Sequence, residues 1–445
     1  MPEFKTPASD QDFHRNFAPI KPLMNASQAH FESARCLYCY DAPCVAACPT
    51  GIDIPLFIKQ IHSGNLAGAA KTIYQSNYFG HSCGKVCPTE VLCEGSCVYN
   101  HQELPPVDIG RLQSFATRAA METNLSISEI PVATGKKAAV IGAGPAGIAC
   151  ACELAAAGVE VEVFEAKELG SGLNVYGVAP YKITNEEALA ELHYLQKQFG
   201  FRIHYRHPVK SREDLQRLEE NFDLIFLGIG LGETSPLQLP GEDLPGVEGA
   251  VEFVENLRIK KAAVKVPPAV IILGAGNTAM DAASEAARMG AAEVTLVYRR
   301  SRESMGAYPF EFELAKSAGV KAVFNAAPVR ISGNGKAESV EFIRTEENGS
   351  KLDNLPGSNF SISADLVLLA TGQGRQRDFL AEIPDLSLDA RGNIVADADT
   401  FVTGNPRYFA AGDVVSGGQE VVNAVANGKK AALAMLKKMG INPNS

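Results

Sequence analysis

The 445-residue sequence predicts an α/β fold in which a helical, cysteine-rich N-terminal domain precedes two nested Rossmann-like dinucleotide-binding domains. Three observations predict it. All ten cysteines lie between Cys36 and Cys152. Two later segments, 136–165 and 269–300, each read as strand, glycine-rich turn, helix and strand. Apolar strand-like segments then follow the second of these, which indicates that one nucleotide domain interrupts the other.

We expect three domains. The cysteine-rich helical domain spans residues 1–130, the first nucleotide domain is discontinuous over 131–240 and 365–445, and the second nucleotide domain is inserted at 241–364. The Pro/Gly-rich segment LPGEDLPGVEG marks the crossing into the insertion. Within the last segment of the first domain, the apolar strand at 365–371 is expected to return the chain to that domain.

The bulk composition excludes several classes of protein. With 46% hydrophobic and 21% charged residues the chain is ordinary globular protein. Its net charge of −10 argues against nucleic acid or an anionic membrane as the main partner, since either calls for a basic surface. The N-terminus lacks the basic-then-apolar pattern of a signal peptide, so we expect a cytoplasmic protein without a membrane partner.

Two cysteine-rich segments flank a helical stretch at Ile54–Tyr74. The first reads CLYCYDAPCVAACP from Cys36, and the second reads CGKVCPTEVLCEGSC from Cys83. The ferredoxin-like spacing, with Pro after the last cysteine of the first set, suits [4Fe–4S] clusters better than the paired short knuckles of zinc sites. Eight cysteines could hold two clusters alone, or zinc could explain one segment. Cys150 and Cys152, on a later helix, are expected to be small buried hydrophobes.

The first glycine-rich turn has the fingerprint of a dinucleotide site. Gly142 permits the tight turn, Gly144 lets the backbone approach a pyrophosphate, and Gly147 allows the helix to pack on the sheet. Glu165 ends the next strand, where a carboxylate binds a ribose diol and favours an adenosine without a 2′-phosphate. FAD or NAD could bind such a turn. The expected contact residues are Gly142, Gly144, Pro145, Ala146 and Gly147.

The second turn repeats this pattern with a different ending. Its strand finishes at Arg299 and Arg300, followed by Arg302, instead of an acid. Guanidinium groups at that point suit a 2′-phosphate and favour NADP(H) over NAD(H), although a solvated arginine run beside a sheet is the alternative. The expected contact residues of the turn are Gly274, Gly276, Asn277, Thr278 and Ala279.

Asp413 lies within the segment FAAGDVV, at the end of an expected strand and before a Gly-rich turn and a helix. We expect it to bind a flavin ribityl hydroxyl, and it could also act as a helix N-cap. With FAD in the acid-ended first site and NADPH in the arginine-ended second, the two cofactors would face each other. Such a chain converts hydride to single electrons, because a flavin accepts two electrons and clusters accept one. The inserted domain has no cysteine, which disfavours dithiol chemistry.

These motifs together resemble one family over nearly the whole chain: the small subunit of bacterial glutamate synthase and the N-terminal, electron-input half of dihydropyrimidine dehydrogenase. The resemblance lies in both cysteine sets and in PVDIGRLQSFAT, VIGAGPAG, ILGAGNTAMD, VYRRSRE and FAAGDVV. It implies two [4Fe–4S] clusters with interleaved ligands, and it implies that Cys83 is not a ligand. One cluster would be held by Cys36, Cys39, Cys44 and Cys97, and the other by Cys48, Cys87, Cys93 and Gln113.

Gln113 and the segment FIRTEENG resemble the pyrimidine branch, whereas the glutamate synthase branch tends to have Glu at the first position. The resemblance therefore implies an electron-input subunit for uracil and thymine reduction, working in a hetero-oligomer with an FMN-barrel partner. A subunit of glutamate synthase or a related reductase is the alternative, and a zinc-stapled nucleotide-binding scaffold is a third. The sequence departs from the family at Val175–Thr184, where the family usually has an Arg-Leu-Pro run near the flavin and Lys182 is expected to stand in for the Arg. It also departs at Gly306, where the pyrimidine enzyme has another phosphate-binding Arg.

Overall fold

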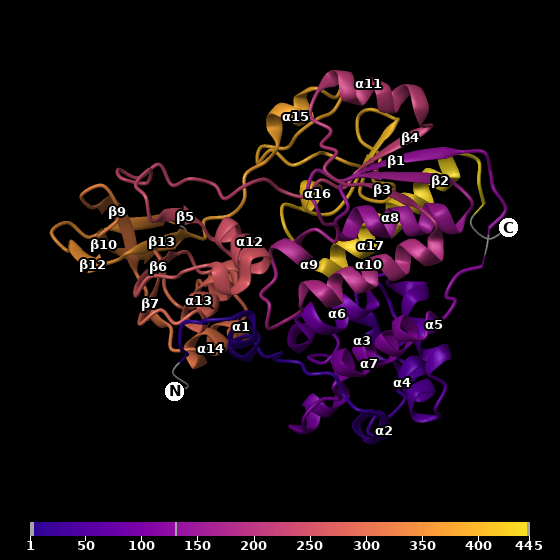
Figure 1. Ribbon diagram of the computed structural model, residues 1–445, viewed down its shortest axis with the longest axis horizontal. Helices are drawn as coiled ribbons and strands as arrows, with labels where there is room; N and C mark the ends of the chain where they lie inside the picture. Colours follow the sequence, from indigo (N-terminus) through magenta and orange to yellow (C-terminus); the bar gives the residue numbers. More distant parts are fainter. Residues whose placement is uncertain (1–3, 130, 350, 443–445) are drawn as a thin grey trace. The chain divides into compact units, whose positions relative to one another are not determined.

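The computed structural model describes residues 4–129, 131–349 and 351–442, with its elements labelled in Figure 1. The chain forms two compact units. The larger unit contains Ile20–Val175, Lys182–Leu231 and the chain from Arg375 onward. The smaller unit contains the chain up to Pro19, the short stretch Tyr176–Tyr181, and Gly232–Gly374.

The larger unit begins with a group of short helices. Side chains cap several of them: Asn25 forms a capping box, and Asp53 and Asn65 accept hydrogen bonds from the first turns that follow them. Phe57, Ile58 and other apolar residues form their common core. The helices are α2 (Ala26–Ala34), α3 (Pro43–Ala46), α4 (Ile54–His62), α5 (Leu66–Ser76), α6 (Gly80–Val86) and α7 (Ile109–Glu122), with 3₁₀ turns at Thr89–Val91 and Val98–Gln102.

A five-stranded parallel sheet with the order β14-β4-β1-β2-β3 follows in the same unit. Its central strands are almost wholly buried, as expected when helices cover both faces of a parallel sheet. In Figure 1 the helices α2–α7 gather on one side of α10 and this sheet lies on the other. The strands are β1 (Lys137–Ile141), β2 (Glu160–Phe164), β3 (Arg202–His204), β4 (Leu224–Leu227) and β14 (Tyr408–Ala410).

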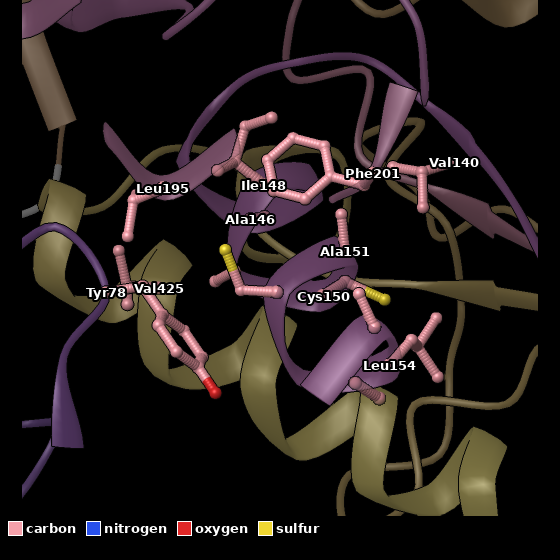
Figure 2. Close-up of a cluster of buried hydrophobic side chains, with 14 of the residues drawn as sticks. Tyr78, Val140, Ala146, Ile148, Cys150, Ala151, Leu154, Leu195, Phe201 and Val425 are labelled. Carbon is pink, nitrogen blue, oxygen red and sulfur yellow. The ribbon is translucent and has the colours of Figure 1, made fainter. Parts of the chain in front are cut away.

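The remaining helices cover this sheet. Helix α8 packs closely on α17, because Gly428 of α17 lies against the Ala146 carbonyl, where a Cβ atom would come within 2.1 Å. Figure 2 shows the core around α8, with Cys150 among apolar side chains, and Cys150 and Cys152 are both fully buried, as predicted. The helices are α8 (Pro145–Ala156), α9 (Leu173–Tyr176), α10 (Asn185–Phe199), α11 (Arg212–Asn221), α15 (Arg377–Ala381), α16 (Asp413–Ser416) and α17 (Val421–Lys438).

The smaller unit contains a second five-stranded parallel sheet, with the order β5-β13-β6-β7-β8. Its strands are β5 (Val247–Gly249), β6 (Ala269–Leu273), β7 (Glu293–Val297), β8 (Lys321–Val323) and β13 (Leu366–Leu369). Its helices are α12 (Ala250–Lys260), α13 (Asn277–Arg288) and α14 (Pro309–Ser317), with a 3₁₀ turn at Lys261–Ala263. The predicted α/β fold, with helices before two parallel nucleotide-binding sheets, is confirmed.

An antiparallel sheet adjoins the second parallel sheet. It has the order β11-β10-β12, and β9 also pairs with β10. Its longest strand, β10, places Thr345 and Glu347 beside the chain that leaves β7, which matters for the second nucleotide site. The strands are β9 (Ala326–Ser332), β10 (Ser339–Asn348), β11 (Lys351–Asn354) and β12 (Phe360–Ser363).

Two expectations about connectivity were wrong. The strand at 365–371, assigned to the first nucleotide domain, is β13, and it pairs with β5 and β6 of the second sheet. All its residues are buried, so its apolar sequence specified a parallel strand without specifying a sheet. The first residues of the chain were predicted to belong to the cysteine-rich domain at 1–130. Its helix α1 (Asp10–Asn16) instead belongs to the smaller unit, where Phe13 and Phe17 pack with Tyr181.

No helix in the described ranges combines the length and the apolar character needed to cross a bilayer.

Candidate functional site

The cysteines gather around two cavities in the larger unit. The first cavity is lined by the four cysteines of one predicted set, with apolar neighbours that include Leu37 and Ile58. Tyr99 fixes its wall, since its hydroxyl donates to the Arg35 carbonyl at 2.7 Å and its ring lies under the Arg35 guanidinium. The cysteines that line it are Cys36, Cys39, Cys44 and Cys97.

The second cavity brings together the other predicted set. Cys48 comes from the first cysteine segment, whereas Cys87 and Cys93 come from the second, so the two segments interleave. Gln113 of α7 also lines it. Cys83 lies there too, and its hydrogen bond to Cys87, together with burial, raises the pKa of the Cys87 thiol well above its ordinary value. Five possible ligands thus surround one cavity.

The chemistry of these thiols fits an iron–sulfur cluster. Burial and neighbouring thiols raise the pKa of Cys44 to about 11, and burial also raises that of Cys93, so thiolates there need a bound cation. Within the described ranges, no group of three or more His, Cys, Asp or Glu side chains is arranged to hold a single metal ion.

Gln113 is held from two directions. Its side-chain amide nitrogen donates to the Gly80 carbonyl at 2.6 Å, which leaves the amide oxygen as the atom able to ligate iron. Its own carbonyl accepts a hydrogen bond from the Thr117 hydroxyl at 2.8 Å. Lys21 lies near the same cavity, with its ammonium group donating to the Cys87 carbonyl at 3.3 Å and to the Thr89 hydroxyl at 2.8 Å. Lys21 lies in a polar stretch of sequence without a motif, so no local signal predicts its position here.

Helix α6, which carries Cys83, is anchored to α10 by a buried polar network. Glu191 of α10 is completely buried and accepts hydrogen bonds from the backbone N–H groups of His81 and Ser82 at 2.6 and 2.8 Å. It also accepts from the hydroxyls of Ser82 and Tyr74. One turn earlier, Glu187 forms an ion pair with Lys85. Burial raises the pKa of Glu191, because its four donors only partly offset desolvation.

The glycines of the first turn divide into two kinds. Gly142 has φ of 99°, and a Cβ there would lie 2.4 Å from the Gly228 carbonyl oxygen, so the fold itself requires glycine. A Cβ on Gly147 would lie 2.0 Å from the Gly142 carbonyl oxygen. Gly144, the N-cap of α8, is different, since the nearest atom to an added Cβ is 3.9 Å away. The space beside Gly144, at a helix N-terminus, fits a diphosphate.

The two predicted acids of this unit, Glu165 and Asp413, both follow strands of the parallel sheet, as expected. Both oxygens of Glu165 accept backbone hydrogen bonds at 2.8 Å, from Ala143 of the glycine turn and from Lys167. This fixes the carboxylate beside the turn, where its other lone pairs can accept ribose hydroxyls. Asp413 begins α16 and accepts a hydrogen bond from the Gln419 N–H, while Gly412 is the N-cap. Burial raises the pKa of Asp413.

The second turn has the same division of glycines. Gly274 has φ of 141°, and a Cβ there would lie 2.3 Å from the Ala370 carbonyl oxygen. Gly276, the N-cap of α13, would direct a Cβ into space with no atom within 4 Å. Asn277 accepts a hydrogen bond from the Tyr308 N–H, Thr278 is exposed, and Ala279 is buried. The open space at Gly276 fits a second diphosphate.

Arg300 and Arg302, which follow β7, form ion pairs with carboxylates. Arg300 donates to Glu347 at 3.0 Å, and Arg302 donates to Glu313 at 3.2 Å while lying over the Phe312 ring. Arg299 is exposed, and its carbonyl accepts a hydrogen bond from the Thr345 hydroxyl. Glu347 was not among the predicted site residues, although it lies inside the FIRTEENG segment on which the resemblance partly rests.

The two departures from the family pattern lie in different units. Lys182 is buried in the larger unit. Gly306 lies in the smaller unit beside the second turn, where the neighbouring Ala307 N–H donates to the Ala275 carbonyl at 3.0 Å.

Two family models match the chain. A model described as "Dihydroprymidine dehydrogenase domain II, 4Fe-4S cluster" matches residues 13–125, and one described as "Pyridine nucleotide-disulphide oxidoreductase" matches residues 136–428. The glutamate synthase [NADPH] small chain of Escherichia coli K12 is 33% identical over 439 residues, covering 94% of this chain and 92% of that protein. The chain belongs to the glutamate synthase small chain family.

A second relative in this family is equally similar. The NAD-dependent dihydropyrimidine dehydrogenase subunit PreT of the same E. coli strain is also 33% identical, over 416 residues, covering 94% of this chain and 95% of that protein. Both relatives are named as parts of larger enzymes. As a member of the family, this chain is an NAD(P)H-dependent oxidoreductase and electron-transfer subunit, with FAD, NAD(P)H and [4Fe–4S] clusters as its cofactors.

Solved structures support the fold of the nucleotide-binding part of this family member. Mycobacterium tuberculosis FprA in complex with NADPH has a TM-score of 0.57 at 20% identity, covering 68% of this chain and 85% of FprA. Thioredoxin reductase of T. acidophilum has a TM-score of 0.53 at 21% identity, covering 70% of this chain and 99% of that one. The iron–sulfur interpretation of the N-terminal segment is confirmed by the family model, so the zinc scaffold is set aside.

Proposed function

We propose that this chain is the electron-input subunit of a dihydropyrimidine dehydrogenase, with an FMN-barrel partner that reduces uracil and thymine at the 5,6 double bond. When bound, FAD accepts the two electrons of NAD(P)H hydride and releases them singly to the clusters. The chain's own residues bind these groups. Glu165 and the space at Gly144 receive the flavin nucleotide, and the space at Gly276 receives the coenzyme.

The observation that carries the pyrimidine assignment is the position of Gln113 in the second cavity, beside three cysteines of the second predicted set. We propose that its amide oxygen is the fourth ligand. The resemblance assigns this corner to Gln113 and not to Cys83, and the Gln113 amide nitrogen donates to the Gly80 carbonyl, so the amide oxygen is the atom offered to iron.

The second candidate function is the small chain of glutamate synthase, because the relatives of both kinds are 33% identical to this chain. The free state of all ten cysteines supports a reducing compartment, and we place either assembly in the cytoplasm.

Capture of the partner subunit distinguishes the two. We expect the tagged chain, purified anaerobically from its own cells, to retain an FMN-containing subunit and to oxidise NAD(P)H when uracil or thymine is added. The isolated chain should reduce viologen dyes and leave uracil unchanged. Retention of a glutaminase-bearing subunit, with NADPH oxidation dependent on glutamine and 2-oxoglutarate, would establish the glutamate synthase assignment.

A further inference from the structure

The chain that leaves β7 forms a small anion-binding site, and the protein fills this site with its own carboxylate. The Glu347 side chain accepts hydrogen bonds from the Arg300 guanidinium and the Ser301 N–H, each at 3.0 Å. The Ser304 hydroxyl donates to both carboxylate oxygens, at 2.9 and 3.1 Å. A guanidinium, a backbone N–H and a hydroxyl converging on one anion are the groups that bind a phosphate.

The position of Glu347 is set by strand pairing. The Thr345 hydroxyl donates to the Arg299 carbonyl at 2.6 Å, and the Asn325 N–H donates to the Arg300 carbonyl at 3.0 Å. These bonds hold the chain after β7 alongside β10. Because side chains alternate along a strand, Glu347, two residues beyond Thr345, lies on the same face and reaches Arg300.

This site lies where a coenzyme's adenosine ribose is expected. In a nucleotide-binding fold the diphosphate lies at the glycine-rich turn, and the end of the second strand contacts the ribose 2′ position. Here the turn is at Gly274–Ala279 and the second strand is β7, which ends at Val297. A carboxylate at this point accepts a hydrogen bond from a 2′-hydroxyl and repels a 2′-phosphate.

We propose that Glu347 determines coenzyme specificity by occupying the site of the 2′-phosphate, so that the chain binds NADH in preference to NADPH. This inference rests on the proposed coenzyme site at Gly276. The hydrogen bonds from Ser301 and Ser304, with that from Arg300, lower the pKa of Glu347 to about 2, so the carboxylate is charged at neutral pH. Arg300 then neutralises Glu347 and is not available to a phosphate.

Binding to the FAD- and cluster-loaded full chain tests the proposal without turnover. Adenosine 2′,5′-bisphosphate and 5′-AMP differ only in the 2′-phosphate, and calorimetry gives a Kd for each. We expect Glu347→Gln to tighten the bisphosphate roughly 10–100-fold, because the negative charge that repels the 2′-phosphate is removed, and to change 5′-AMP little. The NADPH-to-NADH affinity ratio should rise by a similar factor.

Glu313→Gln is the matched control, because it breaks the corresponding ion pair of Arg302, whose side chain is 57% exposed. It should leave both ratios unchanged. In the double variant Glu347→Gln, Arg300→Gln the gain should disappear, which assigns it to Arg300. Unchanged 5′-AMP binding shows that each variant is folded.

Two results would overturn the proposal: an unchanged bisphosphate-to-AMP ratio in Glu347→Gln, or a wild-type chain that binds NADPH more tightly than NADH. Gly276→Ala shows whether the specificity proposal alone is wrong or whether the coenzyme binds elsewhere. If Gly276→Ala abolishes nucleotide binding while Glu347→Gln has no effect, only the specificity inference is wrong. If Gly276→Ala binds NADH normally, the coenzyme site itself is elsewhere.

Discussion

Glu191 accepts two hydrogen bonds from Ser82, one from its backbone N–H at 2.8 Å and one from its hydroxyl at 2.6 Å. The first residue lies on α10, which packs against α8 of the larger unit, and the second lies in the first turn of α6. A carboxylate at a helix N-terminus satisfies backbone donors that have no partner within the helix. The contact therefore joins the cysteine-bearing helices to the helices of the first parallel sheet within one unit.

Replacing this carboxylate should destabilise the protein. Glu191→Gln presents an amide NH₂ to groups that are themselves donors, so at least one charge-assisted hydrogen bond is lost at a cost of about 2–3 kcal/mol. Anaerobic urea unfolding measures the change. Tyr74→Phe removes only the hydroxyl donor to the same carboxylate and should cost about 1 kcal/mol. Equal effects of the two substitutions would show that the α6 contacts contribute little.

The first cluster should depend on Cys39. Cys39→Ala removes one of the four thiols around the first cavity and leaves the second cavity intact. We expect bound iron and sulfide to fall by about half while FAD content is unchanged. Cys150→Ala removes a thiol that is buried away from both cavities and should leave the iron content unchanged. Loss of all iron in Cys39→Ala would contradict two separate clusters.

The second cluster should require Gln113 and should not require Cys83. Gln113→Ala should alter or abolish the electron paramagnetic resonance signal of one cluster, because a ligand is lost. Cys83→Ser keeps a donor next to Cys87 and should leave both clusters in place. If Cys83→Ser loses the cluster and Gln113→Ala keeps its signal, Cys83 is the fourth ligand.

The first glycine turn allows a substitution that affects the ligand without affecting the fold. In Gly144→Ala the new methyl group meets protein atoms only at 3.9 Å, so the apoprotein should unfold at the wild-type temperature, but FAD should bind at least 10-fold more weakly. Gly142→Ala should instead lower the Tm of the apoprotein, because its φ is 99° and the Gly228 oxygen lies in the way. Normal FAD binding by Gly144→Ala would place the diphosphate elsewhere.

The stability of the protein should depend on Glu347 in acid. Its pKa is lowered from 4.5 to about 2, first by the Ser301 N–H and then by the Ser301, Ser304 and Arg300 side chains. Because the folded protein binds this proton less readily than the unfolded chain, Glu347 stabilises the fold above pH 4.5, and the contribution is lost as the pH falls toward 2. Carboxyl NMR titration measures the pKa directly. Between pH 4.5 and about 2, the free energy of unfolding should fall less in Glu347→Gln than in the wild type.

Much of this architecture follows from short-range sequence patterns. The two glycine-rich turns predicted two nucleotide folds because positive φ and close backbone approach are local requirements that glycine alone meets. The cysteine spacing predicted clusters because most ligands of a cluster lie within a short segment of the sequence, so this signal is local too. The resemblance to the family then implied which cysteines share a cluster, and the structure groups the same residues around each cavity.

By itself, the sequence determined the kinds of element and the chemistry of each turn, whereas tertiary packing decided which distant residues meet. Tertiary packing decides which sheet β13 joins and brings Glu191 to the N-terminus of α6. It also pairs Arg300 with Glu347, which lies 47 positions further along the chain. The physical reason is that these partners are far apart along the sequence. A uniformly apolar strand or an isolated carboxylate carries no local signal for its partner, and the partner is selected by strand pairing and burial in the folded chain.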